Sequence, residues 1–228
     1  TAVQLLLAIV VLALVVFGLT YGVVQSRKLG ESEVRQRLGS LLGETRKLFA
    51  TEGLPLAERG TQARRLSEEL DAVVAGAKED VGTGRVEKLR TRLTTVAGLS
   101  ALAAGDVKGA EIAYEQVRGS SSYEVGALAG GLGAFGNGTR DEAIKQLSRA
   151  LQRGLTFPEL ITWRLRLRAQ GARALPSSVA EEVLGDLSVV EGTRTLSEAE
   201  GALRGAAQLA LGRFAEAEAT LATLSSPP

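Results

Sequence analysis

The chain has 228 residues, a formal net charge of +1, and no Cys, His or Met. Without Cys it can form neither disulfides nor thiolate metal sites, and without His the Ser-His-Asp and Cys-His catalytic arrangements are excluded. The near-neutral charge gives no indication of a nucleic-acid partner, and the acidic residues form no conspicuous pair. We therefore expect a protein that is not an enzyme, uses no cofactor or metal and binds no nucleic acid.

The N-terminal segment has the character of a membrane anchor. The first 26 residues carry no charge, and the apolar stretch over residues 5–24 is broken only by Thr20. An α-helix needs about 20 residues to cross the hydrocarbon core of a bilayer. A cleaved signal peptide is the alternative, but the basic start and the small-residue cleavage site that it requires are missing. We expect residues 1–26 to form a single transmembrane helix.

Gly18 and Gly22 lie four residues apart in this span. They form a flat strip on which another membrane helix can pack closely, or they are simply the glycine that is common in membrane helices. Basic residues follow the span and none precedes it: Arg27, Lys28, Arg35 and Arg37. The positive-inside rule therefore favours a cytoplasmic location for the rest of the chain. The composition is compatible with a GC-rich bacterium, so we expect the cell inner membrane.

Residues 27–90 read as a helical connector. Apolar residues recur at helical spacing over Glu31–Phe49, and the Glu-Gly-Leu-Pro stretch that follows should end that helix. A second helix is expected over Ala57–Lys78. The glycines of Gly82–Gly84 should break the chain again, and a third helix should begin near Arg85.

From there a spacing pattern recurs. Gly, Gly and Ala follow one another as G-x6-G-x4-A three times: Gly98, Gly105 and Ala110; Gly131, Gly138 and Ala143; Gly205, Gly212 and Ala217. The offsets of 33 and 74 residues predict a degenerate copy in between, with Arg168 and Leu175 in place of the glycines and Ala180 retained. We expect four helical hairpins. The first Gly should let the second helix of its hairpin approach, the second Gly should form the turn, and the Ala should face the first helix.

The tracts AAGDVKGAEIAYEQV, GNGTRDEAIKQLSRAL and ALGRFAEAEATLATL resemble the tetratricopeptide repeat family. The resemblance covers about Thr91–Leu224, although the aromatic residue of the first helix is missing. It implies an all-α fold in which residues 91–228 form a solenoid of stacked helix pairs that binds other proteins in its concave groove. The groove positions that the resemblance implies are Leu99, Leu102, Leu128, Leu132, Phe135, Leu165, Ala169, Ala206 and Leu209.

Two alternatives concern these positions. An apolar groove suits an amphipathic helix or a hydrophobic segment of a partner, but the chain's own Glu31–Phe49 helix could fill it instead. Trp163, the only Trp, could be an interface anchor or the packing residue of the degenerate unit.

Charge is distributed unevenly along the repeats. Residues 140–173 hold eight basic residues against three acidic ones, and residues 181–218 hold eight acidic residues against three Arg. The predicted basic patch comprises Arg149, Arg153, Arg164, Arg166, Arg168 and Arg173. Such runs are often only solvated helix faces, but a basic patch could also bind anionic lipid headgroups.

These observations predict a membrane-anchored scaffold, or an accessory subunit of a larger integral membrane complex, that binds partner proteins. The alternative is an envelope- or lipid-facing assembly factor that uses the basic patch on anionic headgroups.

Overall fold

The computed structural model describes residues 29–51, 54–77, 81–136, 138–170 and 175–224. These residues fold into helices without a strand, which confirms the all-α prediction. The span predicted for residues 1–26, with Gly18 and Gly22, lies outside the described residues. None of the described helices combines the length and the apolar character needed to cross a membrane.

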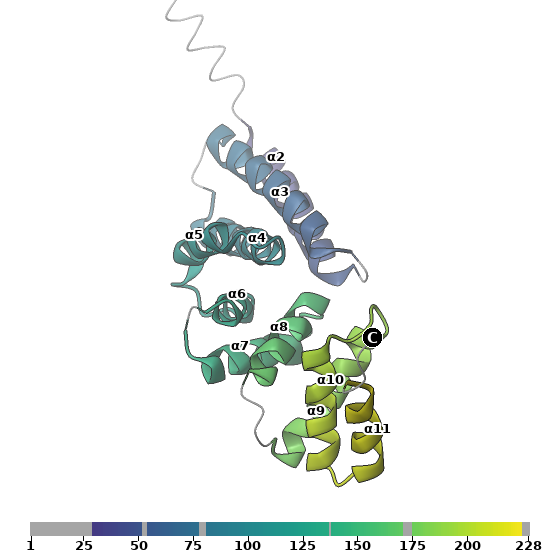
Figure 1. Cartoon of the computed structure of the whole chain (residues 1–228). Helices are drawn as coiled ribbons and strands as arrows, with labels where there is room; N and C mark the ends of the chain where they lie inside the picture. The colour runs from purple at the N-terminus through teal and green to yellow at the C-terminus, as the bar shows by residue number, and fades with distance from the viewer. Residues whose placement is uncertain (1–28, 52–53, 78–80, 137, 171–174, 225–228) are drawn as a thin grey trace, which may run out of the picture.

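The helices follow one another as hairpins along an elongated array, with α2 and α3 at one end and α10 and α11 at the other (Figure 1). Their bounds are α2 Glu31–Ala50, α3 Leu56–Gly76, α4 Thr83–Ala103, α5 Val107–Val117, α6 Tyr123–Ala134, α7 Arg140–Gln152, α8 Pro158–Ala169, α9 Ser177–Glu191, α10 Glu198–Ala210 and α11 Phe214–Leu224.

The predicted connector is an integral part of the array. Its helices α2 and α3 lie within a few residues of their expected bounds, and α4 runs without a break through residue 90, where the repeat domain was expected to begin. Buried side chains of α2, α3 and the first half of α4 form one apolar cluster, which includes Leu41, Leu70 and Leu93. Helices α3 and α4 pack so closely that a Cβ on Gly60 would lie 2.2 Å from the Cβ of Ser100. The N-terminal hairpin therefore covers the first helix of the repeats.

The four expected hairpins are present as α4–α5, α6–α7, α8–α9 and α10–α11, here called units 1 to 4. The alanine of the pattern is buried in every unit: Ala110, Ala143, Ala180 and Ala217. The turn glycines Gly105, Gly138 and Gly212 have φ values of 80°, 119° and 72°. Only glycine adopts such a conformation without strain, which explains why this position recurs.

The first glycines of the pattern serve two kinds of contact. Gly205 admits the second helix of its own unit, as expected, because an added Cβ would lie 2.7 Å from Leu221. Gly98 admits both the second helix of its own unit and the first helix of unit 2, because an added Cβ would lie 2.9 Å from Ala113 and 2.8 Å from Leu128. Gly131 has its nearest contacts outside its own unit. An added Cβ there would lie 2.8 Å from Leu102 in unit 1 and 2.9 Å from Trp163 in unit 3. Gly131 therefore lets units 1 and 3 pack closely against unit 2. The prediction that it makes room for the second helix of its own hairpin is wrong.

Candidate protein-interaction surface

Most of the predicted groove positions belong to the core. The side chains of Leu99, Leu102, Leu128, Leu132 and Leu165 are at most 4% exposed. The expectation that they line an open groove is wrong, because the first helices of units 1 to 3 pack directly on one another through α4, α6 and α8. These five leucines hold the units together and present no surface to a partner.

In units 1 and 2, the residue four positions after the first glycine contacts the next unit. In unit 1 this residue is Leu102, which packs against Gly131. In unit 2 it is Phe135, whose ring meets that of Trp163 edge-on at 6.2 Å between centroids. The Arg166 guanidinium lies 5.2 Å from the centroid of the same Phe135 ring. Trp163 is only 6% exposed, which favours the second of its two alternatives, a packing residue. We call this position the inter-unit position.

In the last unit the inter-unit position is Leu209, and its side chain is 46% exposed. Of the remaining predicted groove residues, Ala169 and Ala206 are half-buried. Phe214, which opens α11 after the turn that follows Leu209, is 68% exposed. The large exposed apolar side chains of the described parts of α10 and α11 are therefore Leu209, which the sequence predicted, and Phe214, which it did not.

The N-terminal hairpin occupies part of the face that a partner was expected to bind. The alternative that the Glu31–Phe49 helix fills the predicted groove is correct only for the last residues of α2, because α2 packs mainly on α3 and α4. Phe49 stacks on Phe157 at 6.1 Å between ring centroids, and Leu56 of α3 is buried in the central cluster. The corner between α2 and α3 thus reaches the start of α8.

Arg59 anchors this corner. Its Nε donates to the carbonyl oxygen of Leu54 at 2.9 Å, its Nη2 donates to that of Thr51, and its guanidinium lies 4.7 Å from the Phe157 ring centroid. The residue is 4% exposed, and Nη1 has no hydrogen-bond acceptor among the described residues. Burial lowers the pKa of Arg59, and the nearby charge of Glu159 opposes that shift.

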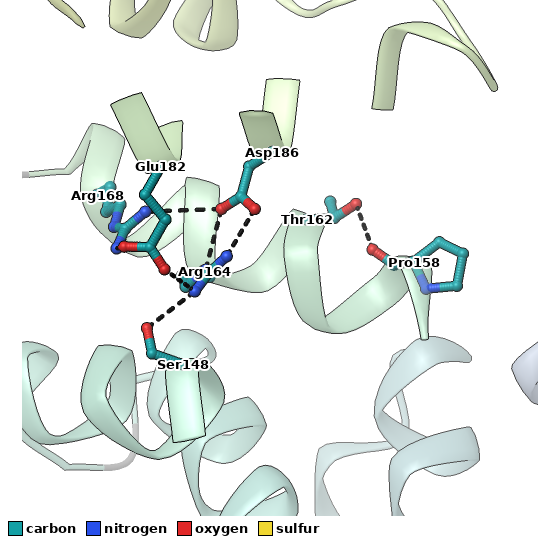
Figure 2. Close-up of polar contacts among 7 residues, drawn as sticks. All are labelled: Ser148, Pro158, Thr162, Arg164, Arg168, Glu182 and Asp186. Carbon is teal, nitrogen blue, oxygen red and sulfur yellow. Dashed lines mark hydrogen bonds and ion pairs between the residues drawn. The ribbon is translucent and has the colours of Figure 1, made fainter. Parts of the chain in front are cut away.

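The predicted basic patch is not one surface. Arg164 and Arg168 are buried between α8 and α9, where Figure 2 shows them facing Glu182 and Asp186. Arg164 donates to Asp186 through Nε at 3.0 Å and Nη2 at 2.6 Å, and through Nη1 to Ser148 at 2.9 Å and to Glu182. Arg168 donates to Glu182 at 2.5 Å. The two arginines are therefore neutralised inside the protein.

Only three members of the patch remain on the described surface. Arg149 on α7, Arg153 at its end and Arg166 on α8 are exposed, and Arg173 lies outside the described residues. The sequence could not reveal the burial of Arg164 and Arg168, since the acids that pair with them lie 14 to 22 residues further along the chain. Burial raises the pKa of Asp186, against the opposing effect of Arg164 and Arg168.

Several acids of the predicted acidic region are also paired. Arg204 bonds to Glu191, and Arg194 bonds to Glu200 at 2.7 and 2.8 Å. Hydrogen bonds from Arg194 and Ser197 lower the pKa of Glu200 to about 2. Glu198 and Glu218 are exposed on α10 and α11 and have no ion pair with a described residue.

Nothing in this surface is arranged as a metal site: the described residues contain no group of three His, Cys, Asp or Glu side chains placed to hold an ion. Comparison with known proteins found no matching family model, and no curated protein and no solved structure with significant similarity to the chain.

Proposed function

We propose that this protein is a non-enzymatic, membrane-anchored scaffold of tetratricopeptide-like units, or an accessory subunit of an integral membrane complex. In this proposal the N-terminal 26 residues hold the chain in the inner membrane, and the array of hairpins binds partner proteins on the cytoplasmic side.

The observation that carries the proposal is the regular array itself. Four hairpins repeat the same buried alanine, and each of units 1 and 2 inserts its inter-unit side chain into the next unit. Repeat arrays of this kind offer extended surfaces that suit protein recognition. The exposed Leu209 and Phe214 supply apolar surface at one end, which is typical of interaction sites.

The alternative of a lipid-facing factor is less well supported. Two of the six arginines on which it rests are buried in ion pairs. The exposed three lie on α7, at its end and on α8, and α7 also carries the exposed acids Asp141 and Glu142. Lipid recognition by a basic cluster requires its charges to be free at the surface.

Affinity purification of the full-length chain from native membranes in mild detergent tests the proposal. A scaffold or accessory subunit should bring down the other subunits of one complex in stoichiometric amounts. Recovery of the chain alone, together with salt-sensitive binding to vesicles of anionic lipid, would contradict the proposal and support the lipid-facing alternative.

A further inference from the structure

We infer that one end of the array lies against the headgroup layer of the bilayer, held there by the short connection to the membrane span. We call this the membrane-proximal end and define it as the start of α2, the end of α3 and the start of α4. The inference rests on the proposed function, in which residues 1–26 span the membrane, and it names the surface of the array that meets lipid.

Three helix ends meet in this surface. The backbone N–H of Leu29, two residues before α2 begins, donates to the carbonyl oxygen of Gly76, the last residue of α3, at 2.8 Å. The side chains of Leu29, Val74 and Val81 pack against the same N-terminal apolar cluster. Val74 and Val81 also line one groove together with Thr83, the first residue of α4. The residues that open α2, close α3 and open α4 therefore belong to one surface.

The point at which the chain enters the array is itself folded. Leu29 forms a parallel β-bridge with Ala77, and its side chain is half-buried. A Cβ on Gly76 would lie 3.3 Å from Cδ1 of Leu29, which is closer than ordinary van der Waals contact. Gly76 therefore makes room for the Leu29 side chain, and the described chain is fixed to the array from Leu29 onward.

The connection from the predicted span to this fixed point is short. Only Arg27 and Lys28 separate residue 26 from Leu29. A chain extends by at most about 3.6 Å per residue, so the three steps from residue 26 to residue 29 cover at most about 11 Å. The headgroup layer on each side of a bilayer is itself about 5–8 Å thick. The membrane-proximal end therefore lies in or directly beside the headgroup layer.

The charges at this end suit contact with phospholipid headgroups. The two acids in the first turn of α2 form ion pairs with arginines one turn further along the helix. Near the start of α4 and in the connections, the remaining charged residues are five basic ones against three acidic ones: Arg27, Lys28, Lys78, Arg85 and Lys88, and Glu79, Asp80 and Glu87. A small excess of positive charge favours contact with anionic lipids.

Fluorescence quenching by labelled lipid tests the inference. Because the chain has no Cys, Gly84→Cys introduces a single thiol in the first turn of α4, and Gly185→Cys introduces the matched control on α9, toward the other end of the array (Figure 1). Both glycines are exposed and have open space around an added Cβ. The full-length chain, labelled with a fluorophore, is reconstituted in liposomes of phosphatidylethanolamine and phosphatidylglycerol that contain a headgroup nitroxide lipid.

A nitroxide quenches a fluorophore only at short range. We expect the label at position 84 to lose most of its fluorescence and the label at position 185 to keep most of it. A Gly-Ser linker of about twelve residues, inserted between Lys28 and Leu29, spans about 20 Å on average. This insertion should restore the fluorescence at position 84, because it frees the array from the membrane surface.

Equal quenching at positions 84 and 185 would overturn the inference. Quenching at position 84 that persists with the linker would also overturn it, because the short connection would then not be what holds this end at the bilayer. Flotation of the liposomes separates the inference from the proposed function. If the wild-type chain floats with the liposomes but position 84 is not preferentially quenched, the inference fails and the proposed membrane anchor stands. If the wild-type chain does not float, the proposed function fails.

Discussion

Arg164 and Asp186 form a two-pronged ion pair inside unit 3, with hydrogen bonds of 3.0 and 2.6 Å from Nε and Nη2. Arg168, one turn further along α8, occupies the position at which the other three units carry glycine. Where units 1 and 4 bring their helices together at a glycine, unit 3 fills the space between α8 and α9 with four charged side chains. The degenerate unit therefore keeps its place in the array by a different chemistry.

The first prediction concerns this network. Asp186→Ala leaves the buried Arg164 without its main partner and should lower the free energy of unfolding by about 3–5 kcal/mol. Urea unfolding of the purified chain, followed by circular dichroism, measures the loss. Glu216→Ala is the control, since Glu216 lies in an exposed pair with Arg213 at 3.8 Å and should cost less than about 1 kcal/mol. Equal losses in the two variants would show that the network does not hold unit 3 together.

The second prediction concerns the close contacts of Gly131. Gly131→Ala places a Cβ 2.8 Å from Leu102 and 2.9 Å from Trp163, so it should destabilise the protein by about 1–3 kcal/mol through overpacking. Gly84, in the first turn of α4, has open space around an added Cβ. Gly84→Ala should be neutral or stabilise the protein by up to about 1 kcal/mol. A thermal melt in which both variants behave alike would contradict the placement of Gly131 between units.

The repeat spacing predicted the four hairpins because it records backbone requirements. A positive φ at Gly105 and the tight packing at Ala110 each restrict the residue type at one position. In units 1, 2 and 4 the second helix and the turn glycine before it were therefore readable from the sequence.

The predicted binding surface was less accurate for a physical reason. An apolar side chain at helical spacing looks the same in sequence whether it faces a groove or a neighbouring helix. Leu102 and Leu209 both fit the groove positions and both lie four residues after the first glycine, yet Leu102 is buried against Gly131 of the neighbouring first helix and Leu209 is 46% exposed. Arg164 and Arg168 were misread in the same way, because their partners come from another helix.

The third prediction is a pH dependence that depends on Glu200. Its folded pKa of about 2 lies below the usual value of 4.5, so its contribution to stability is fully present above about pH 4.5 and is lost as the pH falls toward 2. Because Arg194 is 43% exposed, screening by water limits the contribution to about 1–2 kcal/mol. Urea unfolding at pH 5.5 and pH 2.5 should show a smaller drop for Glu200→Gln than for the wild type. The same drop in both proteins would contradict the role of this carboxylate.

The fourth prediction concerns the N-terminal hairpin. A fragment that begins at Arg85 loses α2 and α3 and exposes the apolar face of α4 at Val86, Leu89, Leu93 and Val96, all buried in the whole chain. We expect this fragment to aggregate in size-exclusion chromatography, because exposed apolar surface of this extent promotes association. A monomeric, cooperatively folded fragment would show that the N-terminal hairpin is a separate connector after all.

The most direct test of the account is the accessibility of position 209 in the native membrane. Because the chain has no Cys, Leu209→Cys and Leu102→Cys each introduce a single thiol that a membrane-permeant maleimide can report. Cysteine at position 209 should react rapidly in the purified chain, and about tenfold or more slowly in native membranes if a partner protein is bound there as proposed. Cysteine at position 102 should be protected in both, because Leu102 is buried. Equal labelling of position 209 in the purified chain and in membranes would contradict the claim that the exposed surface around Leu209 binds a partner protein.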